Sequence, residues 1–533
     1  MRFLHVFYLF LLAATVRLAV VFPILHITTF PIQKYDAYIY VLKALEITRG
    51  NWLPIHTHGI GLPAFLAPFL YLWGGQSIFE HFLIGVLVTA VTGAAIVFPL
   101  AWLSYKLTRS KEASLGAIIM FIFAFPIIIP DNLFIFTESL FTLIFITSLC
   151  LIYKGCDNAA FAYSASAVAG LGYWVRPNGI MILPILVVSF LISCKAGRWR
   201  ALGTAFLMIA VFFAVSGPML YMRHAQFGSA FDYGENSKYF VERYVDVWGA
   251  APSVSIGNYL ASHTAGDIFN RFFIAGTLLA LIYFAYVLLP GIFFFLYGVV
   301  VTWRDPLWFP IWTGIGIWIA SLTPIFYLYY LTRHLFPIAP LGIIMSAAGV
   351  KAMIASRPES KKMVLSIFAA SQAVILCVSI SVFLFSARRF TKDVSRVTAD
   401  SLVWARWAAA HVRGVLAIGN GMNIMMLLPD TEVGGVGMLD LYAPKSRLRI
   451  TYPGKFDSLE EAMPIMRMRK VTHIALEDDV QNPIPFVPNK YLSIYDGERI
   501  PPYLKEIYSN YGTNSQSKAR IFSIDWKEYA RLQ

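Results

Sequence analysis

Eleven long apolar runs constrain the fold of this chain more than any other feature of its sequence. They are residues 4–28, 78–105, 113–130, 133–153, 161–176, 179–194, 201–222, 272–302, 307–326, 332–350 and 363–386. A helix needs about 20 mostly apolar residues to cross the hydrocarbon core of a bilayer. We therefore expect an α-helical integral membrane protein with about eleven transmembrane helices.

The composition agrees with this expectation. Only 14% of the 533 residues are charged and 58% are hydrophobic, whereas a soluble domain carries about 25% charged residues. The net charge is +13, but the basic residues lie mostly in short loops between apolar runs, which indicates membrane topology rather than nucleic-acid binding. The four cysteines lie in or beside apolar runs and form no disulfide framework and no CxxC metal pattern.

Basic residues in the short loops predict an orientation. They gather at 106–111, 154, 195–200, 304 and 351–362. With eleven spans these loops share one side with the N-terminus, and an excess of Lys and Arg marks the cytoplasmic side. We therefore expect a multi-pass protein of the cell (plasma or inner) membrane, with its N-terminus in the cytoplasm and its C-terminal tail outside.

Two segments need a separate interpretation. The run 59–73 is short and rich in Pro and Gly, which favours a juxtamembrane or re-entrant piece. The run 272–302 is long and contains Pro290 and Gly291. We interpret it as one tilted or kinked span, because two spans would place the basic loops on both sides.

The predicted topology divides the chain into a transmembrane domain, 1–389, and an extracytoplasmic domain, 390–533. The first has two outer loops, 29–77 and 223–271. The tail alternates apolar runs with polar turns, which predicts a small α/β domain. Its expected strands include Val415–Ile418, His473–Leu476 and Ala519–Ile524, and its expected helices are Ser401–Arg413 and Leu459–Arg469.

Charged residues at the membrane edge are candidates for function, because charge is costly in lipid. Asp36 follows the first span, and a helical stretch continues from it to near Gly50. A carboxylate at this position could act as general base on an acceptor hydroxyl. It could equally cap the helix or pair with Lys34.

Two histidines follow in the same outer loop. His56 and His58 are separated by one residue, so they could bind a metal or donate hydrogen bonds to a phosphate. The sequence shows no third ligand nearby, which favours hydrogen bonding. A divalent cation remains a candidate cofactor, and no cofactor is required by the sequence.

A third group lies in the outer turn between the third and fourth apolar runs. Asp131 precedes Glu138 in the chain. Glu138 lies just inside the membrane at the start of the next helix, so its carboxylate needs a polar or charged partner. Arg17 in the first span and Arg176 are both candidates for that partner. Glu138 could form a structural ion pair, ligate a cation or orient a substrate.

Arg176 and Arg333 lie on the predicted outer side, against the charge rule. A lipid phosphate would account for them, because a guanidinium group matches phosphate oxygens with two parallel hydrogen bonds. The alternative is that both arginines pair with Glu138 or Asp36.

In their order, these motifs resemble the GT-C glycosyltransferases, in the branch of the protein O-mannosyltransferases and the aminoarabinose transferases. The resemblance covers roughly the first 390 residues. The matching elements are Arg17, Asp36-Ala37-Tyr38-Ile39-Tyr40, the segment from His56 to Gly75, Thr137-Glu138-Ser139-Leu140, Arg176-Pro177-Asn178-Gly179 and Tyr330-Leu331-Thr332-Arg333-His334-Leu335-Phe336-Pro337. The chain departs from the family at Ala37, at His58-Gly59-Ile60-Gly61 and at His334.

The resemblance implies a polyprenyl-phosphate-dependent transfer of a hexose or pentose with inversion. Asp36 would be the catalytic base. Arg333 would bind the donor phosphate, and the further candidates for that role are Arg176, His334, Lys34 and His58. Tyr38, Tyr40, Glu235 and Asn236 would contact substrate or serve the structure. The acceptor would be a lipid, a glycan or a protein.

A multi-pass lipid or glycan transporter or flippase without catalysis is the rival hypothesis. Transporters are often built from paired halves, and this sequence shows no internal repeat. A long extracytoplasmic tail is also unusual for that class, so the sequence favours the transferase.

Overall fold

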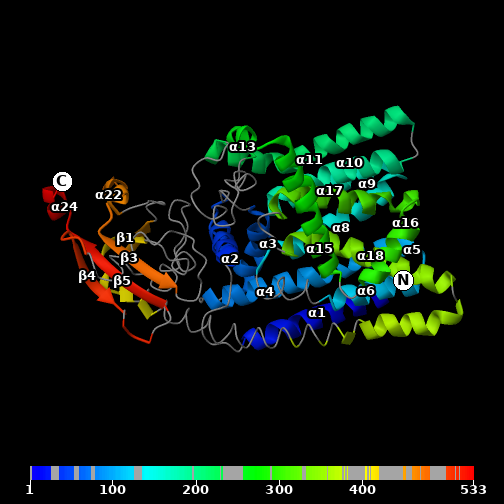
Figure 1. The fold of residues 1–533 in the computed structure, drawn as a ribbon, viewed down its shortest axis with the longest axis horizontal. Helices are drawn as coiled ribbons and strands as arrows, with labels where there is room; N and C mark the ends of the chain where they lie inside the picture. Colours follow the sequence, from blue (N-terminus) through cyan, green and yellow to red (C-terminus); the bar gives the residue numbers. More distant parts are fainter. Residues whose placement is uncertain are drawn as a thin grey trace.

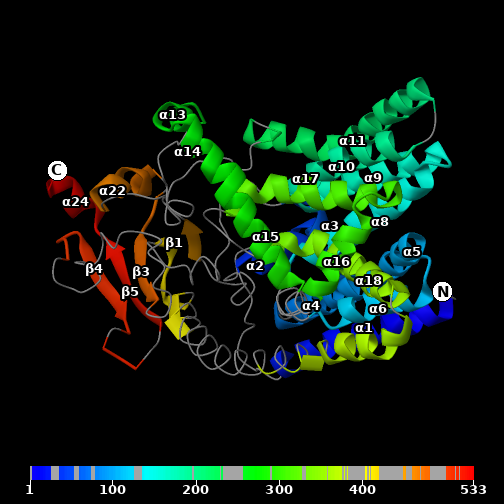
Figure 2. The same ribbon diagram turned by 45° about the vertical axis from the view of Figure 1, so that its right-hand side comes forward.

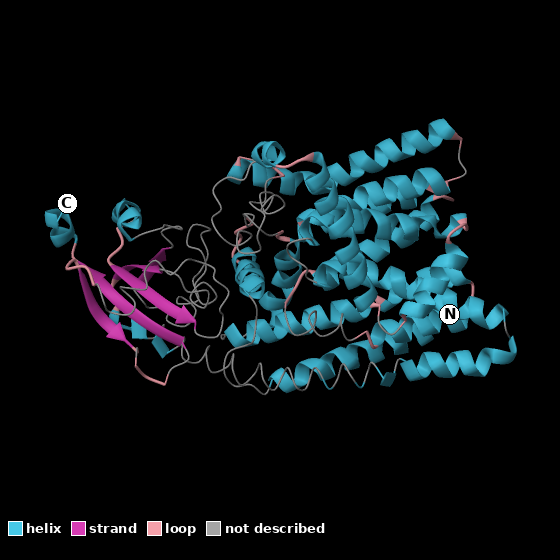
Figure 3. Cartoon of the chain, in the orientation of Figure 1, coloured by secondary structure: helices cyan, strands magenta, loops and turns pink. Residues whose placement is uncertain are grey.

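The computed structural model describes a helical body and a smaller sheet domain at its far end (Figures 1 and 3). The described residues are 3–25, 35–52, 59–73, 78–124, 135–194, 197–228, 230–231, 256–288, 291–326, 332–356, 358–371, 373–374, 377, 381, 403–404, 407–408, 410–418, 448–451, 459–468, 470–479, 500–510, 512–514 and 517–532. The N-terminal end of α1 and the tail lie at opposite ends of the molecule (Figure 1).

Apolar helices build the body. They are α1 (Phe3–Leu25), α2 (Tyr35–Thr48), α3 (Gly61–Trp73), α4 (Ile78–Ala95), α5 (Val97–Thr108), α6 (Lys111–Ile122), α8 (Glu138–Gly155), α9 (Ala159–Val175), α10 (Ile182–Ser193), α11 (Arg198–Phe227), α13 (Ile256–Ser262), α14 (Ala265–Phe269), α15 (Gly276–Val287), α16 (Ile292–Thr302), α17 (Phe309–Phe326) and α18 (Ala339–Ser356). Within the described residues, five continuous helical stretches are long and apolar enough to cross a membrane. The chain is therefore a multi-pass membrane protein, while the count of eleven spans stays a prediction.

The run 272–302 forms two helices, α15 and α16, rather than one. α14, the π-helical turn η3 (Asn270–Ala275) and α15 follow one another along one oblique line (Figure 2). The hydroxyl of Tyr153, in the last turn of α8, donates to the carbonyl of Leu307 at 2.8 Å. The loop after α16 thus lies beside the end of α8, as a single passage through the membrane requires.

The basic loops gather at one end of the body. Lys351 Nζ donates to the carbonyl of Thr108, and the Lys154 ammonium lies 5.3 Å from the ring centres of Trp102 and Phe161. These contacts connect the ends of α5, α8 and α18. The common location that the sequence predicted is therefore present in the structure for the loops at 106–111, 154 and 351–362.

Two further observations concern the segment between α1 and α4. α2 ends at Thr48 and a turn follows to Gly50, which confirms the helix predicted after Asp36. The 59–73 segment forms α3, which has 13 residues and buries Leu62, Leu66 and Leu70 along one side. At 1.5 Å per residue, a helix of this length is too short to cross a bilayer of about 30 Å.

The tail contains a five-stranded mixed sheet in the order β2-β1-β3-β5-β4. The strands are β1 (Gly414–Ile418), β2 (Leu448–Thr451), β3 (His473–Asp479), β4 (Leu504–Ser509) and β5 (Ser517–Ile524). β1 pairs in parallel with β2 and β3, whereas β5 is antiparallel to β3 and β4. The three predicted strands and the predicted α/β class of the tail are confirmed.

Helices cover one face of this sheet with apolar side chains. α22 (Leu459–Met468) supplies Met463 and Met466, and α24 (Trp526–Leu532) supplies Tyr529. These side chains belong to one buried cluster with Ile474 of β3 and Phe522 of β5. The predicted helix 459–469 is thereby confirmed, and residues 403–404, 407–408 and 410–411 of the predicted helix 401–413 are helical.

Candidate functional site

A cluster of charged side chains lies at the end of the body opposite to the basic loops. Its centre is Glu138, the first residue of α8, whose side chain is 2% exposed. The amide groups at a helix N-terminus carry a partial positive charge that stabilises a carboxylate. The Thr137 hydroxyl, 3.5 Å from Oε2, adds a weak hydrogen bond. The start of α8 is thus a natural position for a buried anion.

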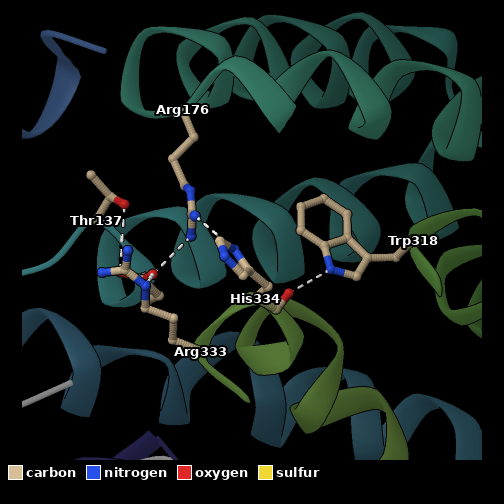
Figure 4. Close-up of polar contacts among 6 residues, drawn as sticks. Thr137, Arg176, Trp318, Arg333 and His334 are labelled. Atoms are coloured by element: carbon tan, nitrogen blue, oxygen red, sulfur yellow. Dashed lines mark hydrogen bonds and ion pairs between the residues drawn. The ribbon is translucent and has the colours of Figure 1, made fainter. Parts of the chain in front are cut away.

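Arg176 reaches this carboxylate from the end of α9. The residue before a proline is restricted to extended backbone, and Arg176, before Pro177, has φ −147° and ψ 142°. This conformation ends α9, and Pro177 begins the 3₁₀ turn η1 (Pro177–Met181). Arg176 Nη1 donates to Glu138 Oε1 at 3.0 Å. Of the two candidate partners of Glu138, the structure brings Arg176 to it (Figure 4).

Arg333 approaches the same carboxylate oxygen from a third element. It belongs to the 3₁₀ segment η5 (Thr332–Ile338), and its Nε lies 3.8 Å from Glu138 Oε1. Its guanidinium group also lies 4.7 Å from the ring centre of Phe136, a cation–π geometry. Two permanent cations therefore meet at one oxygen of Glu138.

His334 extends the cluster on the other side of Arg176. Its Nδ1 lies 3.2 Å from Arg176 Nη2. Because a guanidinium group has no acceptor, Nδ1 must accept this hydrogen bond and the ring proton must sit on Nε2. The histidine is then neutral, so two arginines and one carboxylate leave the cluster with one net positive charge.

α17 fixes the segment that carries Arg333 and His334. Trp318 Nε1 donates to the backbone carbonyl of His334 at 2.8 Å (Figure 4). The Trp318 ring itself packs against Phe141 and Phe145 of α8, with ring centres 5.4 and 5.9 Å away. α17, η5 and α8 thus form one packed unit, and the charged groups sit at its end.

The segment that leads into α3 packs directly against this site. A Cβ atom added to Gly59 would lie 2.2 Å from the Trp174 carbonyl oxygen, and one added to Gly61 would lie 2.6 Å from the Val175 nitrogen. Only glycine permits such close backbone contact. The start of α3, which follows His58 in the chain, therefore lies against the residues that precede Arg176.

The helix that carries Asp36 lies at the same end of the body. A Cβ atom added to Gly85 of α4 would lie 2.6 Å from Ile135 Cδ1 and 3.7 Å from Val41 Cγ2. Val41 belongs to α2, and Ile135 lies three residues before Glu138. α2 and the segment leading into Glu138 therefore meet on α4.

The remaining predicted residues have different outcomes. The structure describes the backbone of Asp36 and Tyr38 in the first turn of α2, but not their side chains, and Tyr40 is buried. Arg17 is buried, donates to the Ala13 carbonyl at 3.4 Å and lies 5.0 Å from the Phe121 ring centre. The residues that lie outside the described ranges are Lys34, His56, His58, Asp131, Glu235 and Asn236.

The buried charged side chains that were not predicted include Lys43, Glu46 and Arg271. On α2, Lys43 Nζ lies 2.6 Å from Glu46 Oε2, and both side chains are buried. In η3, Arg271 Nη1 donates to the Tyr259 hydroxyl at 2.8 Å, and its guanidinium group lies over the Tyr259 ring. In the sequence, Lys43 and Glu46 are recognisable as a Lys–Glu pair three residues apart on a predicted helix. Arg271 is recognisable as an arginine at the edge of an apolar run.

The described side chains give little support for a metal site. Across the described part of the chain, no group of three or more His, Cys, Asp and Glu side chains is placed to hold a metal ion. Glu138, the described carboxylate at the centre of the site, has guanidinium neighbours instead.

Comparison with known proteins gives the fold. No family model and no curated protein sequence matches the chain. Solved structures resemble it, among them the following three. ArnT from Cupriavidus metallidurans bound to undecaprenyl phosphate is 13% identical with a TM-score of 0.58, over 96% of this chain and 97% of that one. Archaeal oligosaccharyltransferase AglB from Archaeoglobus fulgidus, in complex with an inhibitory peptide and a dolichol-phosphate, is 11% identical with a TM-score of 0.59, over 98% and 74%.

The third similar structure is the Archaeoglobus fulgidus oligosaccharyltransferase in complex with Zn and sulfate. It is 12% identical with a TM-score of 0.56, over 88% of this chain and 67% of that one. At these identities the likeness concerns the fold. The chain has the GT-C fold that its sequence predicted.

Proposed function

We propose that this protein is a membrane glycosyltransferase that moves a sugar from a polyprenyl-phosphate donor to an acceptor hydroxyl on the extracytoplasmic face. The observation that carries the proposal is the convergence of Arg176 and Arg333 on Glu138. Residues from α9 and η5 bring two guanidinium groups to one end of the body, beside the helix that begins with Tyr35 and Asp36. Such a cationic cluster is suited to a phosphate.

The charge of the cluster fits the proposed reaction. A polyprenyl-phosphate sugar is a phosphodiester with one negative charge, and its phosphate gains a second charge when the sugar leaves. Prearranged guanidinium groups stabilise charge that develops in this way. Two of the similar structures contain undecaprenyl phosphate and dolichol-phosphate, which supports the same donor class here. His334, Lys34 and His58 are the further proposed phosphate contacts.

Asp36 is the proposed general base. It would take the proton from the acceptor hydroxyl as the oxygen attacks the anomeric carbon from the side opposite the phosphate. The new glycosidic bond forms while the bond to phosphate breaks, and its electron pair leaves with the polyprenyl phosphate. One such displacement inverts the anomeric configuration.

The proposed orientation places this end of the body outside the cell. The basic loops lie at the other end, which we assign to the cytoplasm with the N-terminus. In this assignment the sugar donor reaches the site from the outer leaflet. We further propose residues 1–389 as the catalytic domain and 390–533 as an extracytoplasmic domain.

A deletion strain tests the proposal. Mass spectrometry of surface glycans, lipids and glycoproteins should show the loss of one defined sugar, and the wild-type gene should restore it. This comparison would also name the sugar and the acceptor. An unchanged glycan and lipid profile, with lipid-linked sugar accumulating on one leaflet, would support a transporter instead.

A further inference from the structure

The carboxylate of Glu138 is already engaged by permanent cations. Oε1 accepts a hydrogen bond from Arg176 Nη1 at 3.0 Å, and Arg333 Nε lies 3.8 Å from the same oxygen. The side chain is 2% exposed, so water screens these charges little. A carboxylate with these cationic partners differs from one that is available to coordinate a metal ion.

A divalent cation would fit poorly at this carboxylate. It would bring two further positive charges next to the two guanidinium groups that already face Glu138. Zinc also needs three or four protein ligands, and calcium needs six to eight oxygens. Within the described residues, no three His, Cys, Asp or Glu side chains are placed to hold a metal ion, and the side chains of Asp36, His56, His58 and Asp131 lie outside that description. One structure of similar fold is a complex with Zn and sulfate, so the question of a metal arises for this fold.

We infer that Glu138 is a positioning residue that holds Arg176 and Arg333 together, and that its carboxylate pairs with these two guanidinium groups instead of ligating a divalent cation. The inference rests on the proposed function, because the pair acts on the donor phosphate. In this role Glu138 acts through the two arginines and needs no contact of its own with phosphate or sugar.

The geometry explains why a carboxylate is needed for this purpose. Two guanidinium groups that approach one point repel each other, and the charge of Glu138 offsets that repulsion. Each arginine also has a second neighbour that sets its direction. His334 Nδ1 accepts from Arg176, and the face of Phe136 lies under Arg333. The two groups are thus fixed before a phosphate arrives, which lowers the cost of binding it.

The first experiment measures metal binding without any lipid. Purified full-length protein is stripped with EDTA and titrated with Zn²⁺ and, separately, with Mn²⁺ by isothermal calorimetry. Wild type and Glu138→Gln should give the same result, because any ion they bind sits elsewhere. A stoichiometric site that is present in the wild type and absent in Glu138→Gln would overturn the inference.

The second experiment measures the affinity for undecaprenyl phosphate. The wild type should bind it equally well after EDTA treatment and after addition of Zn²⁺. Glu138→Gln should bind it roughly tenfold more weakly or worse, as expected when a charged hydrogen-bond partner is lost, and Glu138→Asp should recover part of the affinity. Thermal unfolding of each variant is measured beside its lipid affinity, and a loss of affinity in Glu138→Gln no larger than its loss of stability explains would assign Glu138 a merely structural role.

Glu506→Gln is the matched control. Glu506 Oε2 lies 3.1 Å from Arg520 Nη1 in the tail sheet, so this variant removes an Arg–Glu pair far from the site. Its lipid affinity should equal that of the wild type. Binding that disappears with EDTA and returns with Zn²⁺ would overturn the inference and leave the glycosyltransferase proposal standing. A wild type that binds no undecaprenyl phosphate in any condition would count against the proposed donor, while the metal titration would still decide the role of Glu138.

Discussion

Glu138 and Arg176, 38 residues apart in the chain, form an ion pair in which Glu138 Oε1 and Arg176 Nη1 are 3.0 Å apart. The pair joins the start of α8 to the end of α9. Arg333 approaches the same oxygen from η5. The start of α8, the end of α9 and η5 are thereby held together at one end of the helical body. The proposed site for the donor phosphate lies where these three elements meet.

Removal of Arg176 should destabilise the protein. Loss of one partner from a buried ion pair leaves a charge without full compensation, and we expect Arg176→Gln to lower the free energy of unfolding by about 3 kcal/mol. Arg176→Lys should cost less, because it keeps the charge facing Glu138. Thermal unfolding of the detergent-solubilised protein measures both variants. Equal transition temperatures for Arg176→Gln and Arg176→Lys would show that the charge pairing contributes nothing to stability.

We expect His334 to contribute through Nδ1, which accepts a hydrogen bond from Arg176. His334→Leu deprives Arg176 Nη2 of its partner, and we expect a loss of about 1.5–3 kcal/mol in donor binding or stability. His334→Gln can still accept a hydrogen bond and should retain most of the function. The measurement is the affinity of each variant for undecaprenyl phosphate. Equal losses in the two variants would contradict the tautomer inferred for His334.

Gly59 offers a test of the contact between the first outer segment and α9. A Cβ atom at Gly59 would meet the Trp174 carbonyl at 2.2 Å, so Gly59→Ala should push this segment away at a cost of about 1–3 kcal/mol. Gly116→Ala in α6 is the control, because a Cβ atom there meets nothing within 4 Å. Gly59→Ala should lower both thermal stability and transfer activity, and Gly116→Ala should lower neither. If the two variants behave alike, the packing of the 59–61 segment is unimportant for the site.

The sequence predicted the main elements of this fold and only part of the site. Long apolar runs predicted the body, and short apolar runs between polar turns predicted β1, β3 and β5. β2 and β4 were not predicted, because β4 carries Lys505 and Glu506 and β2 has only four residues. Loop charge predicted that Glu138, Arg176 and Arg333 share one end. The choice between Arg17 and Arg176 as partner of Glu138 depends on how α1, α8 and α9 pack, and no local pattern contains that information.

The tail should lose stability as the pH falls below neutral. Burial lowers the pKa of His473, at the start of β3, below its usual range. The unfolded tail therefore binds a proton more readily than the folded one. The stability contribution is complete above the unfolded pKa of about 6.5 and decreases as the pH falls through that value toward the folded pKa.

Limited proteolysis of the full-length protein between pH 7.5 and 5.5 measures this effect. The rate of cleavage within the tail should rise at the acidic end for the wild type and rise less for His473→Gln, which does not titrate. An identical pH dependence in the two proteins would assign the effect to another group.

The central claim is that Asp36 removes a proton from the acceptor while Arg176 and Arg333 hold the donor phosphate. The most direct measurement is sugar release from a panel of radiolabelled polyprenyl-phosphate sugars by membranes containing wild type, Asp36→Asn or Asp305→Asn. Asp305 caps the turn before α17 at the opposite end of the body, and asparagine can keep that cap. We predict that one donor is consumed by the wild type and by Asp305→Asn but not by Asp36→Asn. Undiminished transfer by Asp36→Asn would contradict the mechanism.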